Sequence, residues 1–144
     1  MRELNELFES VLLDHARRPR NHRKLEGATA IGEVSNPLCG DRCTVYLDVA
    51  GGVIKDVSFE GSGCAIMLAS ASLMTLALAN KTVEQAQAVA EEFRVLLMRD
   101  TEKTDGLGDL AALAGVRELP SRIKCALLPW RSMQSALQNE KLRN

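Results

Sequence analysis

Aromatic side chains are scarce in this sequence of 144 residues, which contains three Phe, one Tyr and one Trp. A hydrophobic core built from it must therefore be mainly aliphatic. An excess of charge is also missing, because 18 Lys and Arg nearly balance 19 Asp and Glu. This balance excludes a general electrostatic attraction to nucleic acid or to an anionic membrane, and we expect neither as a partner.

Long hydrophobic runs are absent from the sequence as well. The most apolar stretch, residues 65–79, is rich in Ser and Ala and falls short of the ~20 residues that span a bilayer. The N-terminal segment is too acidic and too interrupted for the apolar part of a secretory leader. The sequence therefore predicts a cytoplasmic protein. Thiols stay reduced in the cytoplasm, so we interpret the four cysteines as metal ligands or nucleophiles rather than as two disulfides.

The length and the composition, with 46% hydrophobic and 26% charged residues, are typical of one globular domain over residues 1–144. Apolar residues at helical spacing begin at Leu4 and continue to Leu12, which predicts an amphipathic helix. Pro19 disfavours helical geometry at the residue before it, so we expect this helix to end ahead of Pro19.

Strands are predicted by alternation of apolar and polar residues. The alternation runs over residues 43–49 and again over 53–59, and the turn-forming pair Gly51-Gly52 separates the two segments. A weaker candidate strand covers residues 28–35. Together these segments predict a three-stranded antiparallel meander within an α+β fold.

The other helices are predicted over residues 65–79, 82–99 and, for one turn, 109–114. Thr82 and Gln85 have the spacing of a capping box, with Thr82 as the N-cap. A terminal helix is predicted to begin near Lys124. Pro129 is compatible with that helix only within its first turn, which places Cys125 near the N-terminus of the helix.

Three of the cysteines occupy positions that favour chemistry. Cys39 and Asp41 share a turn-rich loop that leads into a strand, Cys64 directly precedes a helix, and Cys125 lies at the start of another. A helix N-terminus carries a partial positive charge that favours thiolate over thiol. Thiolate is both the nucleophile and the metal ligand, so Cys64 and Cys125 are placed where we expect them to ionise readily.

Three sulfurs and one carboxylate are enough ligands for a tetrahedral site, and soft thiolates select zinc or iron–sulfur species. We infer that Asp41, the hard ligand among the four, would make such a site exchangeable rather than purely structural. The alternative is that these cysteines are separate and buried, and behave as small hydrophobes. Cys43 differs from the others, because it shares the apolar strand face with Val45 and is interpreted as a core residue. The alternative, from its nearness to Cys39, is a spare or resolving thiol.

Two histidines and a basic turn are the remaining candidate functional features of the sequence. His15 continues the apolar stripe of the first helix, whereas His22 lies in the basic segment 17–24, and both are interpreted as structural or solvated. The basic segment is either a solvated connector or a docking patch for an acidic partner surface.

At these motifs the sequence resembles the IscU/SufU family of iron–sulfur cluster assembly proteins. The resemblance is carried by Asn36-Pro37-Leu38-Cys39-Gly40-Asp41, by Gly61-Ser62-Gly63-Cys64-Ala65-Ile66 with Ala69-Ser70-Ala71-Ser72, by Arg122-Ile123-Lys124-Cys125-Ala126-Leu127-Leu128, and by Asp14-His15 with Pro19-Arg20-Asn21. Two features indicate the SufU branch. Lys124 stands where scaffold-type IscU members usually carry His, and the segment between Cys64 and Cys125 is longer than in typical scaffold members. Met67 stands where many relatives have Ser, and we attach no function to it.

The resemblance implies a sheet with helices on one side and a metal site at one end, with zinc held by Cys39, Asp41, Cys64 and Cys125. It further implies sulfurtransferase activity, with a SufS-like cysteine desulfurase as the persulfide donor and other iron–sulfur assembly proteins downstream. Of the cysteines, we expect Cys39 to accept the sulfur, because a Gly/Pro-flanked loop can move without unravelling a helix, and Cys125 is the second choice. Arg122 and Lys124 either stabilise the incoming sulfur anion or are solvated. The alternative function is a scaffold on which a [2Fe–2S] cluster is built.

Overall fold

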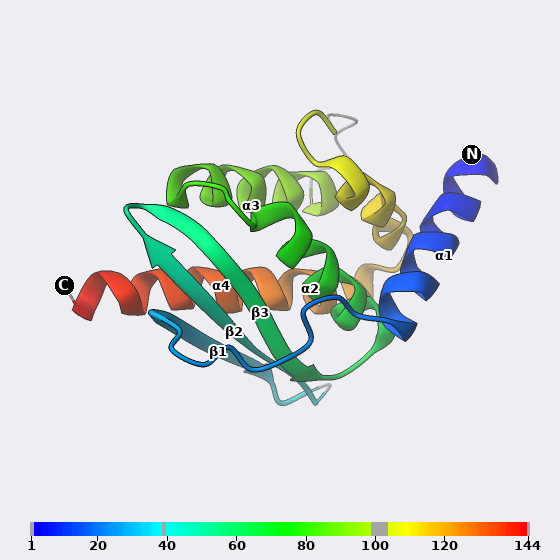
Figure 1. Ribbon diagram of the computed structural model, residues 1–144. Coiled ribbons are helices and arrows are strands. Elements are labelled where there is room, and N and C mark those ends of the chain that lie inside the picture. The colour runs from blue at the N-terminus through cyan, green and yellow to red at the C-terminus, as the bar shows by residue number, and fades with distance from the viewer. Residues whose placement is uncertain (1, 39, 99–103, 144) are drawn as a thin grey trace.

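The computed structural model describes the backbone of residues 2–38, 40–98 and 104–143 (Figure 1). Its elements follow one another as α1 (Arg2–Arg17), β1 (Ala30–Asn36), β2 (Asp41–Ala50), β3 (Val53–Ser62), α2 (Ala65–Leu78), α3 (Val83–Met98), the 3-10 helices η1 (Gly108–Glu118) and η2 (Pro120–Arg122), and α4 (Ile123–Arg143). No helix of the described residues is both long and apolar enough to cross a membrane.

The three strands form one antiparallel sheet in the order β1-β2-β3. Val45 in the central strand pairs with Gly32 of β1 and with Phe59 of β3. Ala50 pairs with Val53 across the two-glycine turn, as the alternation pattern predicts. The predicted meander is therefore confirmed, with a register irregularity after Asp48.

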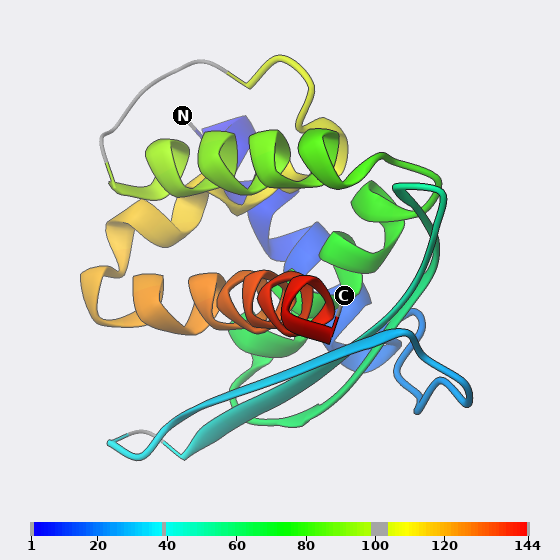
Figure 2. The same ribbon diagram turned by 90° about the vertical axis from the view of Figure 1, so that its left-hand side faces the viewer.

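The helices cover one face of this sheet (Figure 2). Helix α4 packs across β1 and β2, and α2 packs on β3. The contact of α4 with β1 is unusually close, because a Cβ added at Gly32 would lie 2.2 Å from the backbone oxygen of Ser132. The Ser132 hydroxyl donates a hydrogen bond to the carbonyl of Cys43 in β2, at 3.0 Å. The helix thus lies directly on the backbone of two strands, and the predicted α+β class with helices on one side is confirmed.

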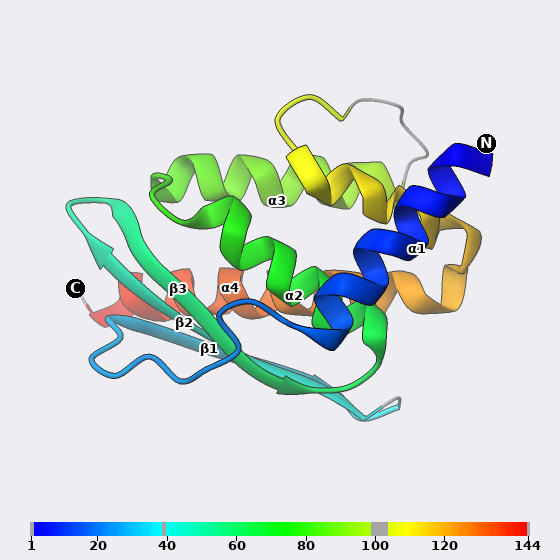
Figure 3. The ribbon, with the colours of Figure 1, turned by 45° about the vertical axis from the view of Figure 1, so that its right-hand side comes forward.

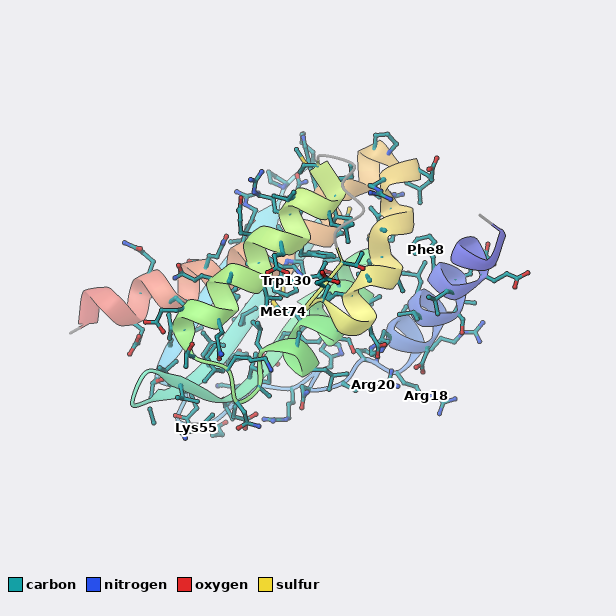
Figure 4. The ribbon with its side chains drawn as sticks, turned by 90° about the horizontal axis from the view of Figure 1, so that it is seen from above. Phe8, Arg18, Arg20, Lys55, Met74 and Trp130 are labelled. Carbon is teal, nitrogen blue, oxygen red and sulfur yellow. The ribbon has the colours of Figure 1, made fainter. Side chains whose placement is uncertain are left out.

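The interior between the sheet and the helices is mainly aliphatic, as expected, with a few aromatic rings. Trp130 of α4 and Met74 of α2 both belong to this core (Figure 4). The Trp130 ring contacts Phe93 of α3 with their centroids 5.3 Å apart. Cys43 is fully buried in this core, and burial raises the pKa of its thiol to about 12. The interpretation of Cys43 as a core residue is confirmed.

The connection between α1 and β1 is held by polar contacts. His15 is buried, and its Nδ1 lies 2.7 Å from the hydroxyl of Ser72. Arg20 pairs with Asp14 at 2.9 Å, on the outer surface at the end of α1 (Figure 4). His22 stacks on Phe59 with their ring centroids 4.7 Å apart. Both histidines therefore have structural contacts, as expected, and Arg20 is engaged within its own chain.

The helix ends differ from the expectations at two places. The capping box is confirmed, since Thr82 and Gln85 exchange hydrogen bonds of 2.9 and 3.1 Å. The single turn expected over 109–114 is instead part of the longer 3-10 helix η1. The placement of Pro129 in a first turn is wrong, because α4 already begins at Ile123 and continues through it. The missing N–H of Pro129 would have bonded the carbonyl of Cys125, so the helix loses that bond only one turn from its start.

Candidate metal centre

The structure brings together three of the four predicted ligands, Asp41, Cys64 and Cys125. Their ligand atoms all lie within 4.8 Å of one another. The three residues come from the start of β2, the residue before α2 and the first turn of α4, and these parts lie at the same end of the molecule (Figure 3). Cys39, the fourth predicted ligand, lies outside the described residues. The expectation that distant segments converge on one spot is therefore confirmed for the described three.

A tight turn between β1 and β2 positions Asp41. Asn36 pairs with Asp41 at the end of the two strands. The Asn36 side chain accepts a hydrogen bond from the Leu38 N–H at 3.1 Å, and its carbonyl accepts one from the Gly40 N–H at 2.8 Å. Gly40 has a φ of +77°, a left-handed conformation that glycine adopts without steric cost. The Asn-Pro-x-x-Gly sequence therefore returns the chain so that Asp41 opens β2 with its side chain buried.

Cys64 contacts Asp41 through both its backbone and its sulfur. Cys64 is the N-cap residue of α2, with extended backbone geometry. Its N–H donates to Oδ1 of Asp41 at 3.1 Å, and its Sγ lies 3.9 Å from Oδ2. One oxygen of the Asp41 carboxylate therefore accepts a hydrogen bond from the Cys64 backbone, and the other faces the Cys64 sulfur.

Cys125 is almost fully buried, with 3% of its surface exposed. Burial, followed by the neighbouring Asp41 and Cys64, raises the pKa of its thiol from 9.0 to about 12. The charge at a helix end is worth only about 0.3–1 kcal/mol, less than one pKa unit. Our expectation of a readily ionised thiol is therefore wrong for Cys125. A cation bound at this position would have to displace the thiol proton.

Arg122, the last residue of η2, brings a positive charge to the two sulfurs. A hydrogen bond to Cys125 is the main cause of a raised pKa of its guanidinium, and the nearby Cys64 contributes next. The same contact opposes the rise in the pKa of Cys125. Arg122 is exposed, and so is Lys124, so the cationic side chains lie at the solvent side of the site.

The donor set fits a thiophilic cation. Two ligands of a tetrahedral zinc ion, one sulfur and one oxygen, are separated by about 3.6 Å. The 3.9 Å between the Cys64 sulfur and the Asp41 oxygen is close to that value. Two sulfurs and a carboxylate also match the ligand preferences of zinc and of iron–sulfur species. The described residues can thus supply three ligands without rearrangement of the fold.

Two positioning features were not found from the sequence. Gly63 lies so close to Asp41 that a Cβ added there would be 2.4 Å from Oδ1. Met67, to which we attached no function, is fully buried, and its terminal methyl group lies beside the same glycine. The Gly-Ser-Gly-Cys segment indicates a turn in the sequence. It does not indicate that Gly63 contacts the carboxylate of Asp41, 22 residues earlier in the chain.

A buried serine connects α2 to the turn that carries Cys125. The Ser70 hydroxyl donates to the carbonyl of Ala126 at 2.6 Å and accepts from Nε1 of Trp130 at 3.1 Å. Ala126 is next to Cys125, whose carbonyl cannot receive a helical bond from Pro129. Because Cys64 precedes α2 and Cys125 lies in the first turn of α4, Ser70 also stabilises the relative position of the two cysteines.

Comparison with known proteins finds relatives along most of this chain. Residues 7–126 match the family of the NifU-like N terminal domain. The zinc-dependent sulfurtransferase SufU of Bacillus subtilis is 36% identical over 139 residues, which cover 96% of this chain and 94% of that protein. The iron–sulfur cluster assembly scaffold protein IscU of Streptococcus pyogenes is also 36% identical, over 94% of this chain and 86% of that protein. A solved SUF-system assembly scaffold protein of Fervidobacterium islandicum superposes with a TM-score of 0.85 and 32% identity, over 92% of this chain and 97% of that one.

Proposed function

This chain belongs to the NifU-like N-terminal domain family, and on that premise we propose that it acts in iron–sulfur cluster assembly. Its specific role is that of a zinc-dependent sulfurtransferase, which accepts sulfur from a SufS-like cysteine desulfurase in the cytoplasm. It passes the sulfur on to other iron–sulfur assembly proteins.

The observation that supports this proposal best is the grouping of Asp41, Cys64 and Cys125 within 4.8 Å at one end of the fold. The three side chains, together with Cys39, would hold the zinc ion. When bound, zinc keeps the coordinating thiols deprotonated and protects them from oxidation. The SufU relative whose name includes zinc dependence is similar along almost the whole chain, which supports the choice of metal.

Cys39 is the proposed sulfur acceptor. Both flanking residues are exposed, and Leu38 exposes 91% of its surface. Cys125, by contrast, is buried and lies in the turn that Ser70 supports. A nucleophile must reach a persulfide on another protein, so the exposed loop suits the acceptor role better. Cys125 remains the second choice.

The transfer step is an exchange between sulfurs. The Cys39 thiolate attacks the outer sulfur of the desulfurase persulfide. A sulfur–sulfur bond forms on Cys39 while the bond within the donor persulfide breaks, and the desulfurase cysteine leaves as a thiolate. The electrons balance without any added oxidant or reductant. Arg122, which already contacts the two described sulfurs, would stabilise the incoming sulfur anion, whereas the exposed Lys124 has a smaller role or is solvated.

The alternative function is a scaffold for assembly and transfer of a [2Fe–2S] cluster. It is supported by the IscU relative, whose identity equals that of the SufU relative. Lys124 argues against it, because an amine on an exposed side chain is a poorer cluster ligand than the histidine that scaffold members usually carry there.

The test combines metal analysis with a sulfur-transfer assay. The protein is purified aerobically, its zinc and iron contents are measured, and it is incubated with a cysteine desulfurase and [³⁵S]cysteine. We expect one tightly bound zinc ion and label on the protein that a thiol reductant removes. Cys39→Ala should abolish labelling, whereas the matched control Cys43→Ala, a change in the core, should retain it.

Two outcomes would contradict this proposal. Stoichiometric zinc with no labelling and no stimulation of the desulfurase would indicate a structural metal site. A brown protein that absorbs in the visible region and transfers its cluster to an apo-ferredoxin would support the scaffold alternative.

A further inference from the structure

The backbone at Gly63 lies against the Asp41 carboxylate more closely than any other residue type would allow. A Cβ built at Gly63 would be 2.4 Å from Oδ1 and 2.8 Å from Cγ of Asp41, and contacts below 3.0 Å force an atom to move. The φ of Gly63 is not in the left-handed region, so backbone conformation does not explain the glycine here. The requirement is steric and comes from the carboxylate.

The carboxylate has little freedom to move away from such a group. Oδ1 accepts the hydrogen bond from the Cys64 N–H at 3.1 Å, and Asp41 exposes only 3% of its surface. The terminal methyl of Met67 lies 3.0 Å from the same Cβ position, and Met67 is fully buried. A side chain at position 63 would therefore push against Asp41 and against Met67 together.

This arrangement assigns different roles to the two carboxylate oxygens. Oδ1 is engaged by the backbone N–H, and Oδ2 faces the Cys64 sulfur at 3.9 Å. A carboxylate can give a metal ion one oxygen or two. We propose that Gly63 is a positioning residue that makes Asp41 a one-oxygen ligand through Oδ2, an inference that rests on the metal site of the proposed function.

The test uses cobalt as a spectroscopic probe for the metal. Wild-type protein, Gly63→Ala, Asp41→Asn and the double variant are loaded with Co²⁺, and their absorption spectra and rates of metal loss to a chelator are compared. Asn at position 41 can still accept the Cys64 N–H bond, but its amide nitrogen is not a metal ligand. We expect Gly63→Ala to keep the thiolate-to-cobalt absorption, to change the ligand-field bands as Asp41→Asn does, and to release metal roughly tenfold faster, the effect typical of lost support for a ligand.

Two comparisons separate positioning from general damage. If Gly63 acts through Asp41, the double variant releases metal no faster than Asp41→Asn alone. Gly115→Ala is the matched control, because its Cβ would meet the ring of Phe8 at 2.6 Å, a comparable clash that involves α1 rather than the site. It should leave the cobalt spectrum unchanged even where it lowers the melting temperature. Gly63→Ala combined with Met67→Ala should not recover the wild-type spectrum, since the contact with Asp41 persists.

X-ray absorption of the wild-type zinc form tests the proposal without any variant. We expect one oxygen at about 2.0–2.1 Å beside the sulfur shell, and two carboxylate oxygens bound to the metal would overturn the inference. A folded Gly63→Ala variant with the wild-type cobalt spectrum and the wild-type rate of metal release would also overturn the inference. Additive effects of the two substitutions in the double variant would do the same. The proposed function would survive each of these outcomes. Wild-type protein that binds neither metal would overturn both proposals.

Discussion

Replacement of Ser70 by alanine tests how much stability the buried contact between α2 and α4 provides. Ser70 is fully buried, and its hydroxyl bonds both the Ala126 carbonyl and the indole N–H of Trp130. Trp130 itself exposes 2% of its surface, so water cannot easily replace the lost partner. A buried polar group left without a partner costs about 1–3 kcal/mol. The Ala126 carbonyl keeps its backbone bond within α4, so the indole N–H of Trp130 is the group left without a partner. We therefore expect Ser70→Ala to lower the free energy of unfolding by about 1–3 kcal/mol.

The matched control is Ser58→Ala, in the middle of β3. Ser58 is also fully buried, but within the described part of the chain its hydroxyl has no hydrogen-bond partner. Removing an unsatisfied hydroxyl is expected to change stability by less than about 0.5 kcal/mol or to increase it. The two variants delete the same atom at the same degree of burial, so their difference isolates the hydrogen bonds.

Urea denaturation followed by circular dichroism, with and without zinc, measures both free energies. For a chain of this size, the cost at Ser70 corresponds to a drop in melting temperature of roughly 3–10 °C. Equal stabilities of the two variants, within about 0.5 kcal/mol, would refute the assignment of stabilising bonds to the Ser70 hydroxyl.

Three further expectations concern pH, packing and the metal. Burial, followed by the charge of Arg20, lowers the pKa of His15 below 6.5. The unfolded chain therefore binds this proton more readily than the folded one, so the contribution of His15 to stability is fully present above pH 6.5 and is lost as the pH falls below it. The variant His15→Gln should flatten the dependence of the unfolding free energy on pH between 7 and 5. An unchanged slope in that variant would exclude His15 as the cause. Gly32→Ala places a Cβ 2.2 Å from the Ser132 backbone oxygen, so the free energy of unfolding should fall by about 3 kcal/mol or more. A near-neutral result in urea denaturation would contradict the close packing of α4 on β1. If zinc is bound as proposed, its removal by a chelator should lower the melting temperature and added zinc should restore it, because a ligand at 100 times its Kd stabilises by about 2.7 kcal/mol. An unaltered melting temperature after confirmed metal loss would contradict a metal that links β2, α2 and α4.

The sheet and the helix caps could be predicted from the sequence because local rules determine them. Alternation over residues 43–49 identifies a strand and, by parity, the buried face that contains Cys43. The capping box at Thr82 depends on atoms three residues apart. The candidate ligand residues were also recognisable as types, since Cys64 directly precedes a helix and Asp41 follows a turn.

What only the tertiary structure decided is how these residues affect one another across long separations. Spacing could not tell whether Cys64 and Cys125 meet, and the dipole argument for an ionised Cys125 failed because burial against Asp41 and Cys64 outweighs a helix end. Pro129 likewise lies beyond the first turn of α4, because the helix already begins at Ile123, and Ser70 of α2 bonds the Ala126 carbonyl next to the one that lost its backbone bond. Local backbone preferences act over a few residues and are readable in sequence, whereas desolvation and close approach depend on which distant atoms the fold brings within a few ångströms.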